Sequence, residues 1–204
     1  MTTDSIYILN AGGADAERER LDIQHTLFTD IVDKQLLPPH IAAELASLPP
    51  SRPPRVCELA TGSAAWLRDL AKVLPASAEL VGIDSDTSKF PPSSSSSSSD
   101  GKDAAAAALP QNVRLLQGDM FQPFGQELQG RFDVVHMRLV VCAARQGSGP
   151  RLAEAAASLL RPGGWLVWVD SNELLTTVQP LSPANSRFQS LSWAFAVAVG
   201  RELE

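Results

Sequence analysis

The segment 56–66 holds the residues whose types and spacing are best suited to chemistry. A short apolar stretch carries Glu58 near its end, and small residues that include Ala60, Gly62 and Ser63 follow before a helical pattern begins. Small residues let the backbone approach a ligand closely, and a helix N-terminus offers unpaired N–H donors. In open parallel sheets the ligand crevice lies at the carboxyl ends of the strands. The segment therefore predicts a ligand-binding loop at that end of a sheet.

The charges around this loop restrict the class of ligand. A dinucleotide-binding loop needs the spacing G-x-G-x-x-G, whereas Gly62 here lies between Ala60 and Ala64. Glu58 would repel a pyrophosphate, and this disfavours a nicotinamide-dependent reductase. Asp84 ends the next predicted strand, where its carboxylate could accept hydrogen bonds from a ribose. A cationic cosubstrate without phosphates fits better, and S-adenosylmethionine is such a molecule.

Strand-like and helix-like stretches alternate from residue 55 onward. Strands are predicted at 55–59, 78–84, 113–119, 132–136 and 165–170, and helices at 64–73 and 152–160. This alternation predicts an α/β fold with a Rossmann-like, mainly parallel sheet and helices on both faces. Arg161–Gly164 is predicted to stop a helix and turn before the last strand, because proline and glycine end helices. Trp66, Trp165 and Trp168 are expected in the core.

Residues 1–50 predict an N-terminal helical extension. Leu21, Gln24, Leu27, Phe28, Ile31 and Val32 recur at the spacing of one helix face. Pro38 and Pro39 end that helix, and a shorter one is predicted at 41–48. A proline-rich connector at 48–54 separates the extension from an α/β domain that spans 51–204.

Two regions depart from the alternation. Residues 90–110 contain seven consecutive serines and five consecutive alanines, which can bury little apolar surface. They predict a disordered insertion between the second and third strands. From 183 to 204 an amphipathic pattern predicts one helix, and no strand pattern follows it.

Several segments, in this order, resemble a known family. The loop resembles the first motif of class I S-adenosylmethionine-dependent methyltransferases, usually D/E-x-G-x-G-x-G. Other segments are similar to fungal secondary-metabolism methyltransferases in particular: Arg20–His25 (RLDIQH), Leu80–Asp84 (LVGID), Pro91 and Pro92 with Leu109–Val113 (LPQNV), Phe132–Leu139 (FDVVHMRL) and Leu160–Trp165 (LRPGGW). The similarity spans roughly residues 7–172 and is more specific than any one motif.

The resemblance implies S-adenosyl-L-methionine as cofactor and a place for it. Glu58, Ala60, Gly62 and Ser63 would surround its methionine part. Asp84 would bind the ribose hydroxyls. Asp119 and Met120, after the third strand, would meet the adenine.

The resemblance also implies a reaction, which is methyl transfer to an oxygen or nitrogen of a small molecule in fungal secondary-metabolite biosynthesis. His136 and Arg138 would lie where cofactor and substrate meet, as candidate catalytic residues. Arg138 could equally be a structural ion-pair partner. A lone histidine after an apolar strand is more often structural than a base, so both roles stay open for His136. Tyr7, Gln24 and His25 would belong to an N-terminal lid.

The sequence departs from the family pattern at two places. Ala60 and Ala64 replace the outer glycines, and their methyl groups would clash if φ is positive there. The family's terminal antiparallel hairpin is expected to be missing, and the resulting uncovered sheet edge predicts self-association. These departures favour the alternative of a non-catalytic, methyltransferase-like regulatory or assembly protein.

Composition excludes several other classes. The net charge of −6 argues against nucleic acid as partner, and the two cysteines are too few for a disulfide framework. The three histidines are scattered in the sequence, so no metal site is expected. No apolar run reaches the roughly 18 residues of a membrane span, and no signal peptide is recognisable. A cytoplasmic protein is expected.

Overall fold

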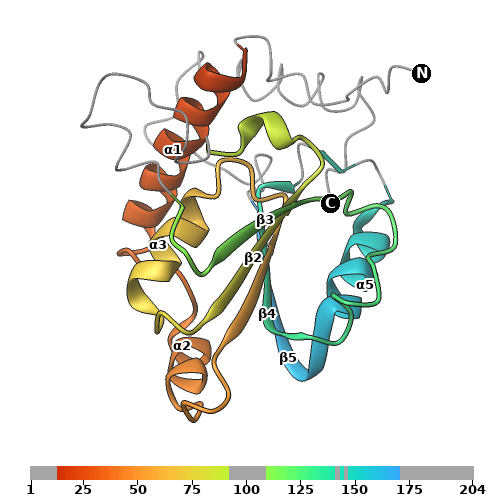
Figure 1. The fold of residues 1–204 in the computed structure, drawn as a ribbon. Helices are drawn as coiled ribbons and strands as arrows, with labels where there is room; N and C mark the ends of the chain where they lie inside the picture. The colour runs from red at the N-terminus through yellow and green to blue at the C-terminus, as the bar shows by residue number, and fades with distance from the viewer. Residues whose placement is uncertain (1–12, 92–108, 141–142, 145–146, 171–204) are drawn as a thin grey trace, which may run out of the picture.

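The computed structural model describes residues 13–91, 109–140, 143–144 and 147–170. Its centre is a parallel five-stranded sheet in the order β3-β2-β1-β4-β5 (Figure 1). The strands are β1 (Arg55–Leu59), β2 (Glu79–Asp84), β3 (Val113–Gln117), β4 (Phe132–Arg138) and β5 (Leu160–Val169). The predicted Rossmann-like fold is confirmed, and four of the five strands start within one residue of their predicted positions.

Helices cover both faces of the sheet, as the alternating pattern predicts. They are α1 (Gly13–Ile31), α2 (Pro39–Ala46), α3 (Ala65–Val73), the short 3-10 helix η2 (Thr87–Lys89) and α5 (Gly149–Leu159). In Figure 1, α2 and α3 lie on one face and α5 on the other. Helix α1 contacts α3 and η2, near the carboxyl ends of the strands.

Two apolar clusters fill the space between the sheet and its helices. Along β1, Val56 belongs to the cluster with α2 and α3, whereas Cys57 and Leu59 belong to the cluster with α5. This follows from the alternation of side chains along a strand. Because both faces are covered, the buried positions of the strand are apolar except for Glu58. Arg55, at the start of the strand, is exposed. The alternation places Glu58 on the face that α3 covers.

Strand β5 differs from its prediction. It begins at Leu160 instead of Trp165, so the expected turn residues lie inside the strand. The ladder with β4 is irregular between Phe132 and Val134. At this irregularity a Cβ on Gly164 would lie 2.9 Å from the carbonyl oxygen of Phe132, so only glycine fits. The glycine therefore allows a bulged start of the strand instead of a turn before it.

The expectation that three tryptophans lie in the core is wrong for two of them. Trp66 is buried, but Trp165 and Trp168 are 39% and 37% exposed. Both belong to β5, which pairs on only one side within the described part of the sheet. The indole Nε1 of Trp165 donates to Glu44 of α2 at 2.8 Å.

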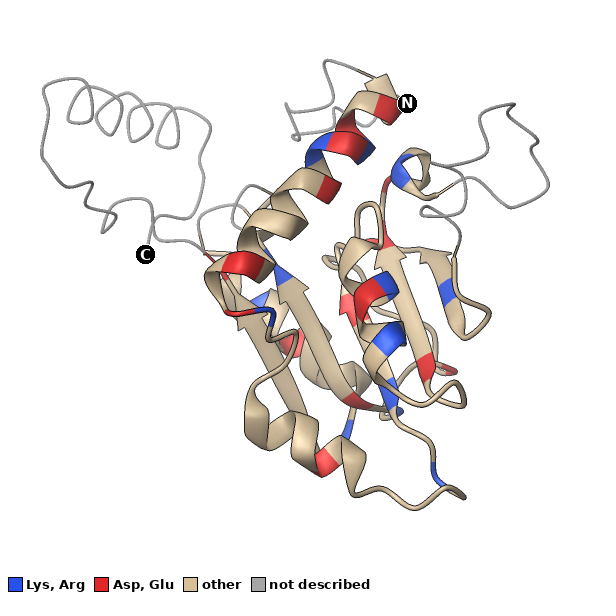
Figure 2. Ribbon diagram, turned by 90° about the vertical axis from the view of Figure 1, so that its left-hand side faces the viewer, with Lys and Arg blue, Asp and Glu red and all other residues tan. Residues whose placement is uncertain are grey.

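A helix forms where the sequence predicted one, but α1 ends at Ile31, before Val32 and well before Pro38, and its apolar residues are not its buried ones. Leu27 and Ile31 are 58% and 68% exposed, whereas Glu17, His25 and Thr29 are buried. The physical reason is the surface beneath the helix. α1 lies over the polar loops at the carboxyl ends of the strands, where polar side chains find partners. Residues of both charge signs occur along it (Figure 2).

Some predictions fall outside the described residues. These are Tyr7, most of the Ser/Ala-rich insertion, the helix at 183–204 and the absent terminal hairpin. In the part that is described, no helix is both long and apolar enough to cross a membrane.

Candidate functional site

The loop between β1 and α3 has an unusual backbone. Ala60, Gly62 and Ala64 all have positive φ, at 54°, 56° and 57°. This left-handed region is natural for glycine and costs an L-residue roughly 1–2 kcal/mol. Ala60 and Ala64 thus have the backbone conformation that the family's glycines would adopt without strain. Hydrogen bonds from Thr61 N to Ile83 O (3.1 Å) and from Ala64 N to Thr61 O (2.9 Å) hold the loop in place.

Glu58 lies at the point where the strand order reverses. The chain proceeds from β1 outward to β3 and returns to β4 on the other side of β1, and Glu58 is the direct neighbour of His136 across β1 and β4. Such a switch point is where open α/β sheets bind their ligands. Glu58 is only 5% exposed and accepts a hydrogen bond from the Thr61 hydroxyl at 2.5 Å. A buried carboxylate is therefore held at the mouth of the switch point.

His136 lies behind Glu58. Its ring stacks on Trp66, with centroids 3.8 Å apart and planes 10° from parallel. Its Nδ1 is 3.3 Å from Glu58 Oε1 and makes no hydrogen bond of good geometry. Burial lowers the pKa of His136, and the neighbouring Glu58 only partly opposes this effect. The side chain is thus a neutral, enclosed imidazole beside the carboxylate.

Asp84 supports the loop from the neighbouring strand. Its Oδ2 accepts from the backbone N–H of Gly62 at 2.8 Å, and its Oδ1 accepts from Asp86 N at 2.9 Å. Lys89 Nζ lies 3.8 Å from Oδ1. A carboxylate has about four acceptor positions. Asp84 can therefore hold the loop and still accept further hydrogen bonds.

Helix α1 is fixed to this loop by polar contacts. Asp22 Oδ1 accepts from the Ser63 hydroxyl at 2.6 Å and from Arg68 Nη2 at 2.7 Å. The side chain of Leu21 lies against Gly62, where an added Cβ would come within 2.9 Å of Leu21 Cδ1. The helix thus covers the loop directly.

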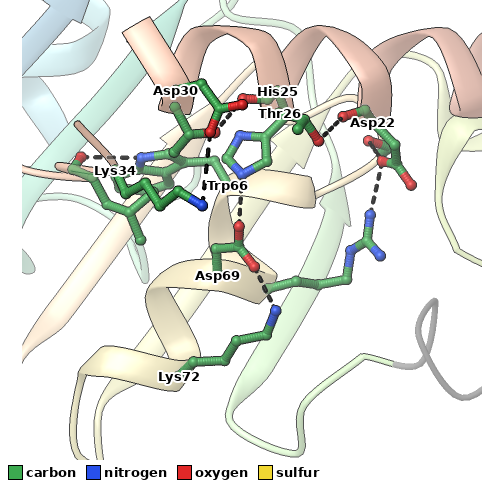
Figure 3. A network of polar contacts seen from close by, with 12 residues as sticks. Asp22, His25, Thr26, Asp30, Lys34, Trp66, Asp69 and Lys72 are labelled. Carbon is green, nitrogen blue, oxygen red and sulfur yellow. Dashed lines mark hydrogen bonds and ion pairs between the residues drawn. The ribbon is translucent and has the colours of Figure 1, made fainter. Parts of the chain in front are cut away.

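A second set of contacts joins α1 to α3 and β4. His25 Nε2 is 3.0 Å from Asp69 Oδ2 (Figure 3), and its Nδ1 is 3.0 Å from Arg138 Nη2. Lys72 also donates to Asp69, at 2.6 Å. Burial alone would raise the pKa of Asp69, but the hydrogen bonds from Lys72 and His25 outweigh it and lower that pKa. Asp69 is thus an ionised acceptor for His25.

A cavity of about 50 Å³ lies between α1, the loop and the end of β4. It is lined by Leu21, Gln24, His25, Glu58, Ala60, Thr61, Gly62, Ser63, Ala65, Trp66, Arg138 and Leu139. The structure thus gathers around one space the predicted loop residues, the two described residues of the predicted lid and Arg138. Asp84 and His136 lie behind this lining instead of in it.

Asp119 and Met120 lie apart from the cavity lining. Asp119 follows β3, and its Oδ1 accepts from the backbone N–H of Phe121 at 2.8 Å. Met120 is 9% exposed and packs in the cluster beneath α5. Within the described ranges no group of three or more His, Cys, Asp or Glu could hold a metal ion.

Sequence reasoning missed three residues that shape the site. Thr61 lies inside the loop motif, and Asp22 lies inside the RLDIQH segment. Both could therefore have been predicted as site residues from these motifs. Asp69 had no such signal. It lies on α3 in a region predicted as an ordinary helix, and only the packing of α1 on α3 brings it to His25.

Comparison with protein families shows to which family the chain belongs. A family model described as "Methyltransferase domain" matches residues 33–199, well over half of the chain. The chain belongs to this methyltransferase family. Residues 33–199 include β1, the loop and every strand of the sheet, whereas α1, which contributes Leu21, Gln24 and His25 to the cavity lining, lies before the matched range.

Curated relatives come from fungi, which confirms the resemblance seen in the sequence. The chain is 31% identical over 187 residues to N-methyltransferase tcpN of Claviceps purpurea (strain 20.1), covering 91% of the chain and 60% of the relative. It is 31% identical over 172 residues to methyltransferase grgD of a Penicillium species, covering 81% and 52%. The chain thus spans little more than half the length of these relatives.

A solved structure supports the fold. An O-methyltransferase family protein from Burkholderia thailandensis superposes with a TM-score of 0.57 at 19% identity, over 94% of this chain and 50% of that one. At this identity the likeness concerns the fold alone.

Proposed function

We propose that the chain binds S-adenosyl-L-methionine and transfers its methyl group to a nitrogen or oxygen of a small molecule in fungal secondary metabolism. One observation carries the proposal. Glu58 and Asp84, at the carboxyl ends of adjacent strands, flank a loop whose backbone has positive φ at Ala60, Gly62 and Ala64. The names of relatives such as tcpN and gliN (Aspergillus fumigatus) favour nitrogen as the acceptor atom.

The residues present suit such a cosubstrate. Glu58 offers a buried carboxylate to an ammonium group, and Asp84 keeps acceptor capacity for a ribose diol. The cavity of about 50 Å³ is small, since ligand pockets usually measure roughly 300–1,000 Å³. Binding therefore requires the side chain of Leu21, on α1, to move off Gly62. In this proposal α1 is the lid that the sequence predicted.

The bound cosubstrate would supply an electrophilic sulfonium methyl group. The chain would contribute orientation and exclusion of water, because a leaving thioether needs no proton. His136 is enclosed by Trp66 and neutral, so we assign it the positioning of Glu58 instead of proton removal from the acceptor. A residue that acts as base would have to face the cavity.

Calorimetric titration with S-adenosylmethionine and S-adenosylhomocysteine tests the proposal. We expect micromolar binding, and a loss of at least tenfold in Glu58→Ala and in Asp84→Ala. Glu127→Ala, which removes an exposed carboxylate elsewhere on the surface, is the control and should bind like the parent chain. Equal affinity in all four proteins would refute the assigned site.

A second candidate is a non-catalytic, methyltransferase-like regulatory or assembly protein. The left-handed Ala60 and Ala64 favour it, because Ala60 lines the cavity at a position where the family pattern has glycine. A folded chain that binds neither nucleoside would support it. The same hypothesis predicts that the outer edge of β5 pairs with another chain, which sedimentation velocity would detect as a dimer.

A further inference from the structure

Arg138 differs from the other half-buried arginines of the described residues. Arg18, Arg20, Arg68, Arg131 and Arg161 each pair with a carboxylate. Within the described ranges Arg138 has no carboxylate at ion-pair distance. It donates to His25 and lies over the ring of Phe28, 5.6 Å from its centroid. A half-buried cation without a carboxylate partner is unusual, because removal of charge from water is costly.

The position of Arg138 is set by the alternation along β4. Val134, His136 and Arg138 point to the face that α3 covers, since they are two residues apart. Arg138 is the last residue of the strand, so its side chain extends past Glu58 and lines the cavity. Its charge is therefore presented to the space in which a ligand would bind.

The guanidinium is held in place by a chain of hydrogen bonds. Arginine has no acceptor atom, so Nδ1 of His25 must accept from it. The imidazole proton is then on Nε2, which donates to Asp69. Asp69 and His25 thus act as positioning residues that fix Arg138 at one Nη2 hydrogen. Its other donors keep the fork geometry that matches two carboxylate oxygens.

We propose that Arg138 binds the carboxylate of a ligand in this cavity. Two sources carry that chemistry: the α-carboxylate of the adenosyl cosubstrate, which rests on the proposed function, and a carboxylate on the acceptor molecule. Either one supplies the anionic partner that the other half-buried arginines find within the chain.

The first experiment compares two nucleosides by calorimetry. S-Adenosylhomocysteine carries a carboxylate, and S-adenosyl-3-thiopropylamine keeps the amine and lacks only that carboxylate. If the cosubstrate is the source, the parent chain prefers the first ligand by at least tenfold. In Arg138→Gln this preference falls to within twofold, while the affinity for the thiopropylamine stays the same.

Two variants sharpen this comparison. Arg131→Gln removes a half-buried arginine that is paired with Glu79, and it should keep the full preference. His25→Leu should reduce the preference several-fold without changing the affinity for the thiopropylamine. A merely structural role of His25 would instead lower both affinities together.

The second experiment applies when the preference is absent, or when it survives in Arg138→Gln. The side-chain Nε resonance of Arg138, assigned by its absence in Arg138→Lys, is followed by ¹⁵N NMR during titration with acetate and then acetamide at constant ionic strength. A saturating shift with acetate only, absent for Arg131, identifies an acceptor carboxylate. No shift, or equal shifts of both arginines, overturns the proposal.

The two proposals fail in distinguishable ways. A parent chain that binds neither nucleoside contradicts the proposed function, and the acetate titration of the free chain then decides the role of Arg138. A parent chain that binds both nucleosides equally, with no acetate shift, supports the cofactor site and refutes the carboxylate receptor.

Discussion

The buried carboxylates at the two ends of the sheet, Asp133 and Glu58, differ in how many hydrogen bonds they accept from the chain. At the amino end, Asp133 accepts from Arg52 Nη2 at 2.6 Å, from the backbone N–H of Arg55 at 2.9 Å and from Arg161 Nε. At the carboxyl end, Glu58 has the Thr61 hydroxyl and the poorly aligned Nδ1 of His136.

The difference extends to the neighbouring residues. The carboxyl end contains the left-handed alanines, the cavity and Arg138, whereas Asp133 lies among arginines that are all paired. Polar groups satisfied within the chain stabilise the fold, while strain and unused hydrogen-bonding capacity gather where a ligand binds. The amino end therefore satisfies its buried carboxylate within the chain, whereas the carboxyl end keeps the hydrogen-bonding capacity that the proposed ligand site needs.

The largest effect is expected from Asp133→Ala. It leaves Arg52 and the backbone N–H of Arg55 without their acceptor and removes one of the two carboxylates that pair with Arg161. Loss of one partner from a buried pair costs about 3 kcal/mol or more. Urea unfolding should show this loss in the free energy of unfolding. Under conditions where nearly all of the variant is folded, its affinity for the nucleosides should equal that of the parent chain. Asp30→Asn, which breaks the exposed pair with Lys34, is the control and should change stability by less than about 0.5 kcal/mol. Equal effects of the two variants would contradict the comparison.

A smaller effect is expected on the pH dependence of the free energy of unfolding, to which His136 at the carboxyl end of the sheet and Asp133 at the amino end contribute in different pH ranges. Since burial lowers the pKa of His136, the unfolded chain takes up a proton below pH about 6.5 while the folded chain does not. The free energy of unfolding should therefore fall as the pH decreases, by up to about 1.4 kcal/mol per pH unit, until the lowered pKa is reached. Unfolding curves between pH 5 and 8 measure this slope, which His136→Gln should reduce.

The control for this slope is His40→Gln, because His40 is exposed. It should leave the slope unchanged. Asp133 contributes in a different range. Burial alone would raise its pKa, but the bonds from Arg161, Arg55 and Arg52 outweigh burial and lower it, so its stabilisation is lost only below about pH 4. A slope near neutral pH that survives in His136→Gln would contradict the assignment of a buried neutral imidazole.

The smallest effect is expected in the loop. Ala64→Gly removes a left-handed penalty of roughly 1–2 kcal/mol but adds unfolded-state entropy worth about 0.4–1 kcal/mol. A net stabilisation of about 0.5 kcal/mol is expected in urea unfolding. Ala60→Gly should in addition raise nucleoside affinity, because Ala60 lines the cavity and glycine lets the backbone approach a ligand more closely. Unchanged affinity would show that the methyl group of Ala60 does not hinder binding, and a loss of stability in Ala64→Gly would contradict the strain at that position.

The strand and loop positions were predictable because their signals are local. β1 was predicted at its observed bounds, since apolar residues followed by small ones identify a strand that enters a ligand loop. The start of β5 was not, because the pattern Arg-Pro-Gly-Gly is typical of a turn. Only the backbone of Phe132 against Gly164 makes it part of a strand. The exposed Leu27 and Ile31 likewise depended on what α1 covers, and no pattern within the helix contains that information.

By itself the sequence determined the class of fold, the acidic residues at two strand ends and the small-residue loop between them. These follow from periodicity and residue type, which act over a few neighbouring residues. The tertiary structure alone decided that His136 is enclosed by Trp66, that Asp69 fixes His25, and that Arg138 faces the cavity without a carboxylate partner among the described residues. Such relations join residues up to 113 positions apart. They arise because strand alternation and the packing of α1 on α3 bring distant side chains together, and burial then sets which charges are satisfied.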